Sequence, residues 1–441
     1  MAYITRTTGT PTDRKKFTYS AWLKLANIET YQRPIQNYVD GNNRGYILYC
    51  HNTDSANNTW FFYDRIGAQI NFQANSAGKY RDTNGFYHLV VRADTTQSTQ
   101  ADRYRVYING EQISLSIATN IGQNVDLGFN NSGANLRIGG QESGSETWKG
   151  VMSHVHFCDG YSYAPTEFGS TDATTGEWKI NTSPSVTYGN NGYFVFKDDN
   201  AVTDRSGQGN NFTLSGSITK TEDNPSNVFA TLNPLHSGSI TFSNGNNTQG
   251  NTSSTGQNAL STLGAVSGKF YAEVKCTAVG SNGTNVGFVN LSKSNLMNQS
   301  ITPGQDNFSA GLYSNGGPIY YSSETTFATV GSTSNGDIIQ LAMDLDNGYL
   351  YWGRNGTYLN SGVPTSGSTG TGGLATSNLG VGHIGFGMWQ RNSATASWNF
   401  GNGFFGTTAV SSAGTNASNN GIFEYDVPAG YTALSTKGLN L

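Results

Sequence analysis

The feature of this sequence that most limits its fold is a repeated alternation of short strand-like runs and turn residues. Runs of β-branched and aromatic residues, such as 17–25, 45–50 and 86–92, are each bounded by Gly, Asn or Asp. β-Branched and aromatic side chains favour strands, whereas Gly, Asn and Asp favour the turns between strands. Runs at this spacing are typical of sandwiches rather than of alternating strands and helices. The sequence therefore predicts an all-β fold.

Two Asn-Gly pairs predict tight hairpins. Asn109-Gly110 follows the strand-like run 104–108, and Asn347-Gly348 follows the run 337–344. An Asn-Gly pair supplies the positive φ angles that a type I′ turn needs. The only helical segment expected is 164–168, because Pro165 suits a first helical position.

The composition agrees with a folded β protein of low charge. Charged residues make up 12% of the sequence, against roughly 25% in an average soluble domain. Glycine is abundant, with 56 residues, which by itself is also typical of disordered segments. However, the 24 Tyr, 22 Phe and 7 Trp residues can bury enough apolar surface to fold the chain.

Charge, hydropathy and cysteine spacing limit which partners the protein could bind and in which cell compartment it is made. A net charge of −4 without a basic stripe gives little support to a nucleic-acid partner. No apolar run approaches a membrane span, and the first residues carry no signal region, so no membrane insertion is expected. Cys50, Cys158 and Cys276 lie far apart in the sequence. This spacing predicts reduced, buried thiols in a protein made in a reducing cytoplasm.

A chain of 441 residues exceeds what one hydrophobic core usually supports, so two domains are expected. The strand pattern places one sandwich in residues 1–160 and a second in residues 230–441. The mixed, turn-rich segment 161–229 is predicted to connect them, with the short helix and some extra strands.

Several motifs resemble known domains. Four segments resemble parts of a laminin-G-type, concanavalin A-like jelly roll: 17–25, 86–92, 104–113 and 148–158. Three segments resemble parts of a SPRY domain: 268–275, 336–358 and 423–434. The order of the two domains is similar to that of structural proteins of tailed bacteriophages, especially marine and cyanobacterial ones. This resemblance implies two antiparallel jelly-roll β-sandwiches in a virion protein.

The resemblance favours a non-enzymatic protein on the surface of the particle, as a head decoration, a knob or a short appendage that could aid host attachment. Its partners would be other virion proteins, a host-surface glycan or receptor, or further copies of itself, with no cofactor. One alternative is a receptor- or glycan-binding adhesin of a tail fibre or tail tip. A more remote alternative is a polysaccharide depolymerase.

The depolymerase alternative requires a catalytic set of carboxylates. Glycoside hydrolysis uses two carboxylates that flank the scissile bond. The closest acidic pairs, Asp344/Asp346 and Glu424/Asp426, lack the third carboxylate of the Glu-x-Asp-x-x-Glu pattern. The sequence therefore predicts no catalytic residues.

Two groups of residues are candidate metal ligands. Strand periodicity places His154, His156 and Cys158 on one face, where they could bind zinc with an acidic partner. Alternatively, they belong to an ordinary strand with one polar face. Three aspartates could offer oxygen ligands to calcium, or simply form turns: Asp198, Asp199 and Asp204.

Exposed aromatic residues are candidate ligand-binding residues. In SPRY domains partners bind loops at one end of the sandwich, which implies five positions here: Tyr313, Tyr320, Tyr321, Trp389 and Arg391. The tryptophans that could serve either a sugar site or a core are Trp60, Trp148, Trp178, Trp352 and Trp389. Trp22 and Trp398 are expected at core strand positions.

Overall fold

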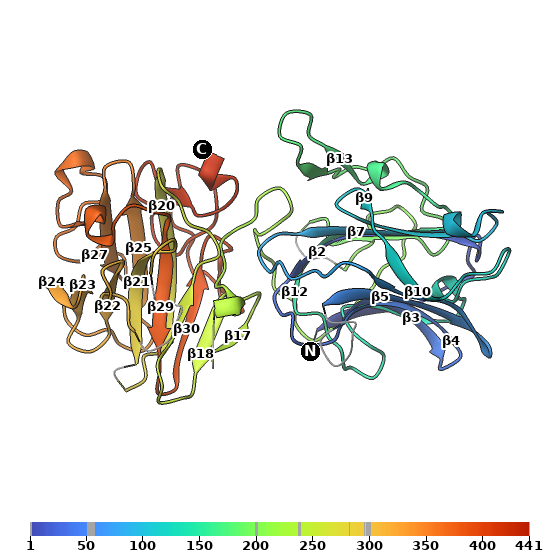
Figure 1. Ribbon diagram of the computed structural model, residues 1–441, viewed down its shortest axis with the longest axis horizontal. Helices are drawn as coiled ribbons and strands as arrows, with labels where there is room; N and C mark the ends of the chain where they lie inside the picture. Colours follow the sequence, from blue (N-terminus) through green and yellow to red (C-terminus); the bar gives the residue numbers. More distant parts are fainter. Residues whose placement is uncertain are drawn as a thin grey trace. The chain divides into compact units, whose positions relative to one another are not determined.

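The computed structural model describes residues 2–50, 58–198, 202–236, 240–281, 283–294, 296 and 301–440 (Figure 1). Within these residues the regular structure consists of strands and short 3-10 turns, without an α-helix. The predicted all-β class is thus confirmed. The chain divides into two compact units, Met1–Lys220 and Thr221–Leu441. No helix among the described residues is long and apolar enough to cross a membrane.

The first unit is a sandwich of two antiparallel sheets, seen as two layers in Figure 1. One described sheet has eight strands in the order β10 (Leu115–Thr119), β6 (Gln69–Ser76), β5 (Thr59–Ile66), β4 (Asn43–Cys50), β3 (Gln32–Asp40), β11 (Asn135–Ile138), β1 (Tyr3–Thr7) and β16 (Thr213–Ser215). The other has six in the order β15 (Tyr193–Val195), β12 (Gly150–Asp159), β2 (Lys16–Leu25), β7 (Tyr87–Asp94), β8 (Tyr104–Ile108) and β9 (Glu111–Gln112).

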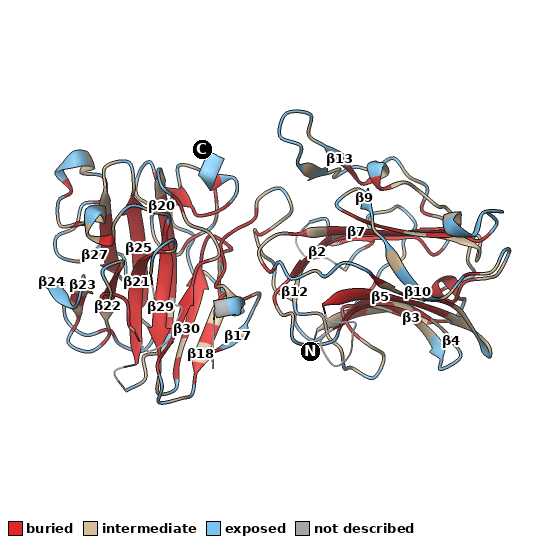
Figure 2. Ribbon diagram, viewed as in Figure 1, coloured by how far each residue is buried: buried red, intermediate tan, exposed pale blue. Residues whose placement is uncertain are grey.

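Alternation along each strand builds the core of this sandwich. In β2 every second residue faces the opposite sheet, and Tyr19 pairs with Val91 of β7 on that face. Trp60 and Phe62 of β5 meet them from the eight-stranded sheet, and both are completely buried. Figure 2 shows that buried residues lie along the strands of both sheets. Burial of each large side chain stabilises the fold by about 1.5–3 kcal/mol.

The segment 161–220, expected as part of a connector, belongs to the first unit. β15 pairs with β12, and β16 pairs with β1. The physical reason is that Tyr193 of β15 and Phe212, just before β16, are buried in the core of the first sandwich, which holds both strands on its sheets. The predicted short helix is a single 3-10 turn, η3 (Pro165–Glu167), with proline at its start.

Residues 161–188, here called the cover segment, pack on the outer face of the six-stranded sheet. The segment contains η3 and the hairpin of β13 (Gly169–Thr171) and β14 (Trp178–Ile180), which lies above β7 in Figure 1. Thr18 of β2 binds the segment twice, through Tyr161 O at 2.9 Å and Tyr163 N at 2.7 Å. This face of the sheet is therefore buried under the chain's own residues.

The second unit is also a sandwich of two sheets. Its described nine-stranded sheet follows the order β17 (Thr241–Ser243), β18 (Thr248–Asn251), β30 (Ala394–Asn399), β20 (Lys269–Ala278), β25 (Ile338–Asp344), β26 (Tyr349–Arg354) and β27 (Thr357–Tyr358), with β28 (Leu374–Ala375) on β26 and β33 (Thr432–Ala433) on β20. Its six-stranded sheet follows the order β19 (Gln257–Leu260), β29 (Ile384–Gln390), β21 (Thr284–Asn290), β22 (Ser309–Tyr313), β23 (Pro318–Tyr321) and β24 (Thr325–Thr329).

The two predicted hairpins are confirmed. β8 and β9 pair around Asn109 and Gly110, whose φ angles are 50° and 82°. β25 and β26 pair around Asn347-Gly348, where Asp344 accepts a hydrogen bond of 3.0 Å from Asn347 N. Both residues of the first turn have positive φ angles, whereas in the second turn Gly348 has a φ of 81° and Asn347 does not have a positive φ.

Candidate binding groove

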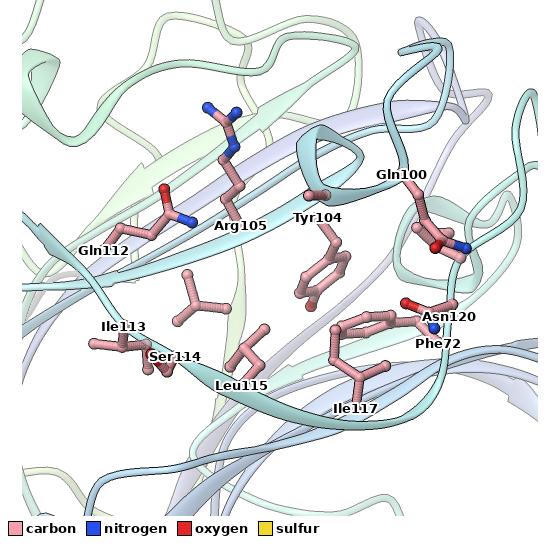
Figure 3. A pocket seen from close by; sticks show the side chains of 13 residues that line it. Phe72, Gln100, Tyr104, Arg105, Gln112, Ile113, Ser114, Leu115, Ile117 and Asn120 are labelled. Atoms are coloured by element: carbon pink, nitrogen blue, oxygen red, sulfur yellow. The ribbon is translucent and has the colours of Figure 1, made fainter.

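A groove of about 450 Å³ opens at one edge of the first sandwich, between β10 on one sheet and β8 and β9 on the other. Figure 3 shows four side chains that point toward one another within it, those of Phe72, Tyr104, Leu115 and Ile117. The polar side chains of Gln100 and Asn120 lie at the rim. The groove is therefore apolar inside and polar outside.

The groove exists because one sheet extends further than the other at this edge of the sandwich. Ile117 pairs with Ala74, a core residue, so the Ile117 side chain points toward the interior face of its sheet. The opposite sheet ends in β9, which has only two residues. Ile117 consequently finds no strand across from it and is 46% exposed. The sequence signal for this strand was the uncharged run 113–119, with an apolar residue at every second position. Nothing in the neighbouring sequence showed that the strand lies at the edge of a sheet.

The groove offers little acid–base chemistry. Its thirteen lining residues include no carboxylate, histidine or cysteine. Tyr104 is stacked on Phe72 with ring centroids 4.0 Å apart, and burial raises the pKa of its phenol well above the ordinary value. Arg105 is paired with Asp102. This arrangement suits binding of an apolar group rather than catalysis.

The five residues predicted as a ligand site in the second unit are only partly brought together. Tyr313 and Tyr320 contact each other edge to face, with ring centroids 4.7 Å apart, and the Tyr313 hydroxyl contacts Thr302. Tyr321 pairs with Ala310 and packs against the core, so it faces the other side of the sheet.

Trp389 and Arg391 lie further along this sheet. The Arg391 guanidinium is 5.1 Å from the centre of the Trp389 ring, and both Trp389 and Tyr313 flank Asn285 on one face. However, Trp389 is only 6% exposed. A Cβ added at Gly256 would approach its ring to 2.0 Å, so the chain itself covers the indole.

Five of the other six tryptophans serve the interior, and Trp178 lies partly buried on β14. Three are in the two cores: Trp60, Trp352 and Trp398. Trp148 packs against the first core as a partly buried residue. Trp22 is buried on the opposite face from the core expected for it, beneath the cover segment, because it pairs with His88 on that face.

The residues considered for zinc are held in other contacts. The register of β12 shifts just before His156, and His154 has a φ of 48°, so a bulge interrupts the regular alternation that was expected. His156 Nδ1 is 2.9 Å from the Tyr188 hydroxyl, and its ring stacks on Phe194 at 3.9 Å. Cys158 is buried in the same cluster, which raises the pKa of its thiol. No group of three or more His, Cys, Asp or Glu side chains in the described part of the chain could hold a metal ion.

The two described aspartates among those considered for calcium have other roles or are exposed. Asp204 is buried and organises its own loop. It accepts backbone N–H bonds of 2.8–2.9 Å from Phe194, Ser206 and Asn210. The Asp198 side chain is 57% exposed, and Asp199 lies outside the described residues. The oxygens of Asp204 are thus already used by backbone donors.

Other buried carboxylates are anchors for backbone. Asp64 accepts N–H bonds of 2.9 Å and 2.8 Å from Gly128 and Phe129, and burial raises its pKa to about 6. Glu273 accepts N–H bonds of 2.8 Å and 2.9 Å from Glu424 and Tyr425, and burial raises its pKa to about 7. Each of these groups joins segments that are distant in sequence.

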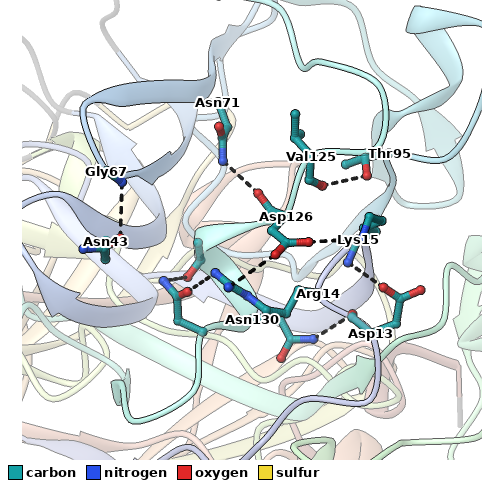
Figure 4. Close-up of polar contacts among 12 residues, drawn as sticks. Asp13, Arg14, Lys15, Asn43, Gly67, Asn71, Thr95, Val125, Asp126 and Asn130 are labelled. Atoms are coloured by element: carbon teal, nitrogen blue, oxygen red, sulfur yellow. Dashed lines mark hydrogen bonds and ion pairs between the residues drawn. The ribbon is translucent and has the colours of Figure 1, made fainter.

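The acidic pairs weighed as catalytic are also used structurally. Asp344 is completely buried, 3.0 Å from Lys269 Nζ, and Asp346 accepts a bond of 2.7 Å from Gly268 N. Glu424 and Asp426 each accept a backbone N–H bond of 2.7 Å from a neighbouring loop. At the surface, Figure 4 shows Asp126 between Arg14 and Lys15, at 3.4 Å and 3.3 Å. Such partly exposed ion pairs contribute little to stability.

All three cysteines are free and buried, which confirms the prediction. Sequence reasoning did not single out His88, which is completely buried under the cover segment. Its Nε2 is 2.8 Å from Ser20 Oγ, and its Nδ1 accepts a bond of 2.9 Å from Trp178 Nε1. An indole nitrogen only donates, so His88 is neutral with its proton on Nε2. Burial lowers its pKa to about 3.

Comparison with known proteins agrees with part of this picture. Residues 2–167 match the family described as the concanavalin A-like lectin/glucanases superfamily, which confirms the domain predicted there. No curated protein matches the chain.

Similar solved structures include three SPRY domains. The SPRY domain of human HERC1 is 14% identical with a TM-score of 0.30, covering 38% of this chain and 96% of that one. The TRIM65 PSpry domain is 12% identical with a TM-score of 0.30, covering 38% and 91%. A human SPRY domain is 14% identical with a TM-score of 0.28, covering 37% and 95%.

Proposed function

We propose that this protein is a non-enzymatic structural component of a bacteriophage particle. It is made in the host cytoplasm and exposed on the particle surface as a head decoration, a knob or a short appendage. The virion assignment rests on the order of sequence motifs that resembles structural proteins of tailed phages. Other virion proteins are its expected partners.

The observation that carries the non-enzymatic part is how the carboxylates are used. Hydrolysis of a glycosidic bond needs two carboxylates roughly 5–9.5 Å apart, facing the substrate. Asp64, Asp204 and Glu273 instead accept hydrogen bonds from backbone N–H groups, and no carboxylate lines the groove of the first sandwich. An apolar groove without an acid–base pair supports binding and assembly.

The proposal is tested on purified particles. The chain is expected to remain with infectious particles through a density gradient, and antibodies against it should label intact particles. Loss of the chain during purification, or labelling only after the particles are disrupted, would contradict the surface assignment. Release of reducing ends from host polysaccharide by the purified chain would contradict the non-enzymatic assignment.

A second candidate function is glycan or receptor binding, which the edge-to-face pair of Tyr313 and Tyr320 favours because both rings are only partly buried. Saturable binding on a glycan array that is lost in Tyr320→Ala and kept in Tyr320→Phe would support it. Absence of binding to glycans and host cells would contradict this second candidate and leave only the structural role.

A further inference from the structure

The edge strand β10 has the features of an unfinished sheet. It is the terminal strand of the eight-stranded sheet, and among the described residues it pairs only with β6. Proteins usually protect such an edge with a charged side chain or a proline. β10 contains neither, since its sequence is Leu-Ser-Ile-Ala-Thr, and residues 115–118 are exposed or partly exposed.

The backbone of β10 directs hydrogen-bonding groups outward. Ser114 O accepts a bond of 2.9 Å from Ala77 N on the β6 side. Because these groups alternate in an antiparallel pair, the N–H and C=O groups of Leu115 and Ile117 point away from β6. Two residues therefore offer both a donor and an acceptor at the open edge.

The side chains of the same two residues are also incompletely covered. Leu115 and Ile117 face the groove of about 450 Å³, and Ile117 is 46% exposed. At this edge, unpaired backbone and exposed apolar surface coincide, which is the combination used when a strand is added to a sheet.

The opposite edge of the sheet is a weaker candidate. β16 has three residues, and no groove residue lies on it. Ser215 of β16 faces the same side of the sheet as Ser116 of β10, because their partners Tyr3 and Asn75 both point away from the core. The two serines therefore make a matched pair for experiments.

We propose that β10 pairs antiparallel with β10 of a second copy of this chain, about a two-fold axis at Ser116. In this register Leu115 of each copy faces Ile117 of the other, and the two Ser116 residues face each other. Both Leu115–Ile117 pairs then exchange N–H···O bonds through the outward groups. The regular stretch 114–117 precedes the bulge after Ile117, so nothing interrupts the pairing.

A second copy fits because the strand is complementary to itself. The paired stretch has no charged residue, so no like charges meet across the axis. Apolar Leu115 and Ile117 meet on the groove side, while the small Ser116 residues meet on the outer side. Each copy closes the open side of the other's groove, as a two-fold symmetric interface requires. The interface does not depend on where the protein sits in a particle.

Self-association is measured by light scattering on the full chain over a range of concentrations. The wild type should approach twice 47.2 kDa as the concentration rises. Ile117→Lys should remain at 47.2 kDa, because each lysine would face the apolar Leu115 of the other copy and place a charge in that contact. Since Ile117 is half exposed, its replacement should leave the thermal unfolding temperature nearly unchanged, which shows that the variant is folded. A wild type that stays monomeric, or an Ile117→Lys variant that still dimerises, overturns the proposal.

A cysteine pair tests the register independently. Residues in a non-hydrogen-bonded antiparallel pair have Cα atoms about 4.5 Å apart, within the range of about 4.4–6.8 Å that a disulfide spans. Ser116→Cys should form an intermolecular disulfide under mild oxidation, whereas the matched Ser215→Cys should not. The three natural cysteines are buried and do not compete. Equal cross-linking of the two variants, or capture of an extended segment of another protein by a monomeric chain, refutes pairing between copies.

Discussion

The contact between the cover segment and the six-stranded sheet depends on pH through the protonation of His88. The imidazole lies between Trp22 and Trp178, with ring centroids 4.5 Å and 6.0 Å away, and both of its nitrogens are hydrogen-bonded. A second proton would have to go on Nδ1, which faces the N–H of Trp178. Protonation therefore breaks the bond that holds β14 to the sheet and places a charge in a buried site.

The sign of the effect follows from the direction of the pKa shift. Burial lowers the pKa of His88 from 6.5 to about 3, so its contribution to stability is complete above pH 6.5 and is lost as the pH falls toward 3. One bound proton changes the free energy of unfolding by about 1.4 kcal/mol per pH unit. Two pH units below 6.5, the loss from His88 alone is about 3 kcal/mol.

Other groups in the same unit also titrate in this window. Burial lowers the pKa of His154 to about 4 and that of His156 well below its ordinary value, which adds to the loss at acid pH. Asp64 acts in the opposite direction, because its pKa is raised to about 6, and offsets about 2 kcal/mol. The difference between wild type and a His88 variant is therefore the informative quantity.

The variant is His88→Gln, whose amide can donate to Ser20 and accept from Trp178 without titrating. Urea unfolding of the full chain, followed by tryptophan fluorescence at several pH values, should show the two proteins diverging in slope below pH 6.5, by about 1.4 kcal/mol per pH unit. His383→Gln in the second unit controls for histidine replacement. Parallel pH profiles for wild type and His88→Gln would refute the reasoning, as would unchanged hydrogen exchange in residues 169–180 at low pH.

Three further predictions concern packing, a buried carboxylate and the thiols. Gly256→Ala should destabilise the second unit by about 1–3 kcal/mol, because the added Cβ meets the Trp389 ring; thermal unfolding measures this, and an unchanged midpoint contradicts it. Glu273→Gln should cost about 2–4 kcal/mol in urea unfolding, because an amide NH2 would face backbone N–H donors; a cost below about 0.5 kcal/mol contradicts the anchoring role. Reducing agents should leave both unfolding transitions unchanged, because all three cysteines are free. A shift in either midpoint on reduction would show a disulfide.

Local patterns were enough to predict much of the fold. Residues 17–25 form β2, and the turns at Asn109-Gly110 and Asn347-Gly348 form as expected. These predictions succeed because strand preference, alternation and turn geometry depend on neighbours within a few residues. The resemblance of residues in the first part to a concanavalin A-like domain was also sufficient to identify that domain.

The candidate sites depended on contacts that a linear pattern does not contain. His156 and Cys158 are buried against Tyr188 and Phe194, which come from later in the chain. Gly256, in the loop before β19, covers Trp389. The groove beside Ile117 exists only because β10 ends one sheet where the opposite sheet stops short. The sequence by itself determined which residues form strands and turns, since those preferences are local. The tertiary structure decided which strand lies at an edge and which side chains stay uncovered, since exposure depends on residues brought together from distant parts of the chain.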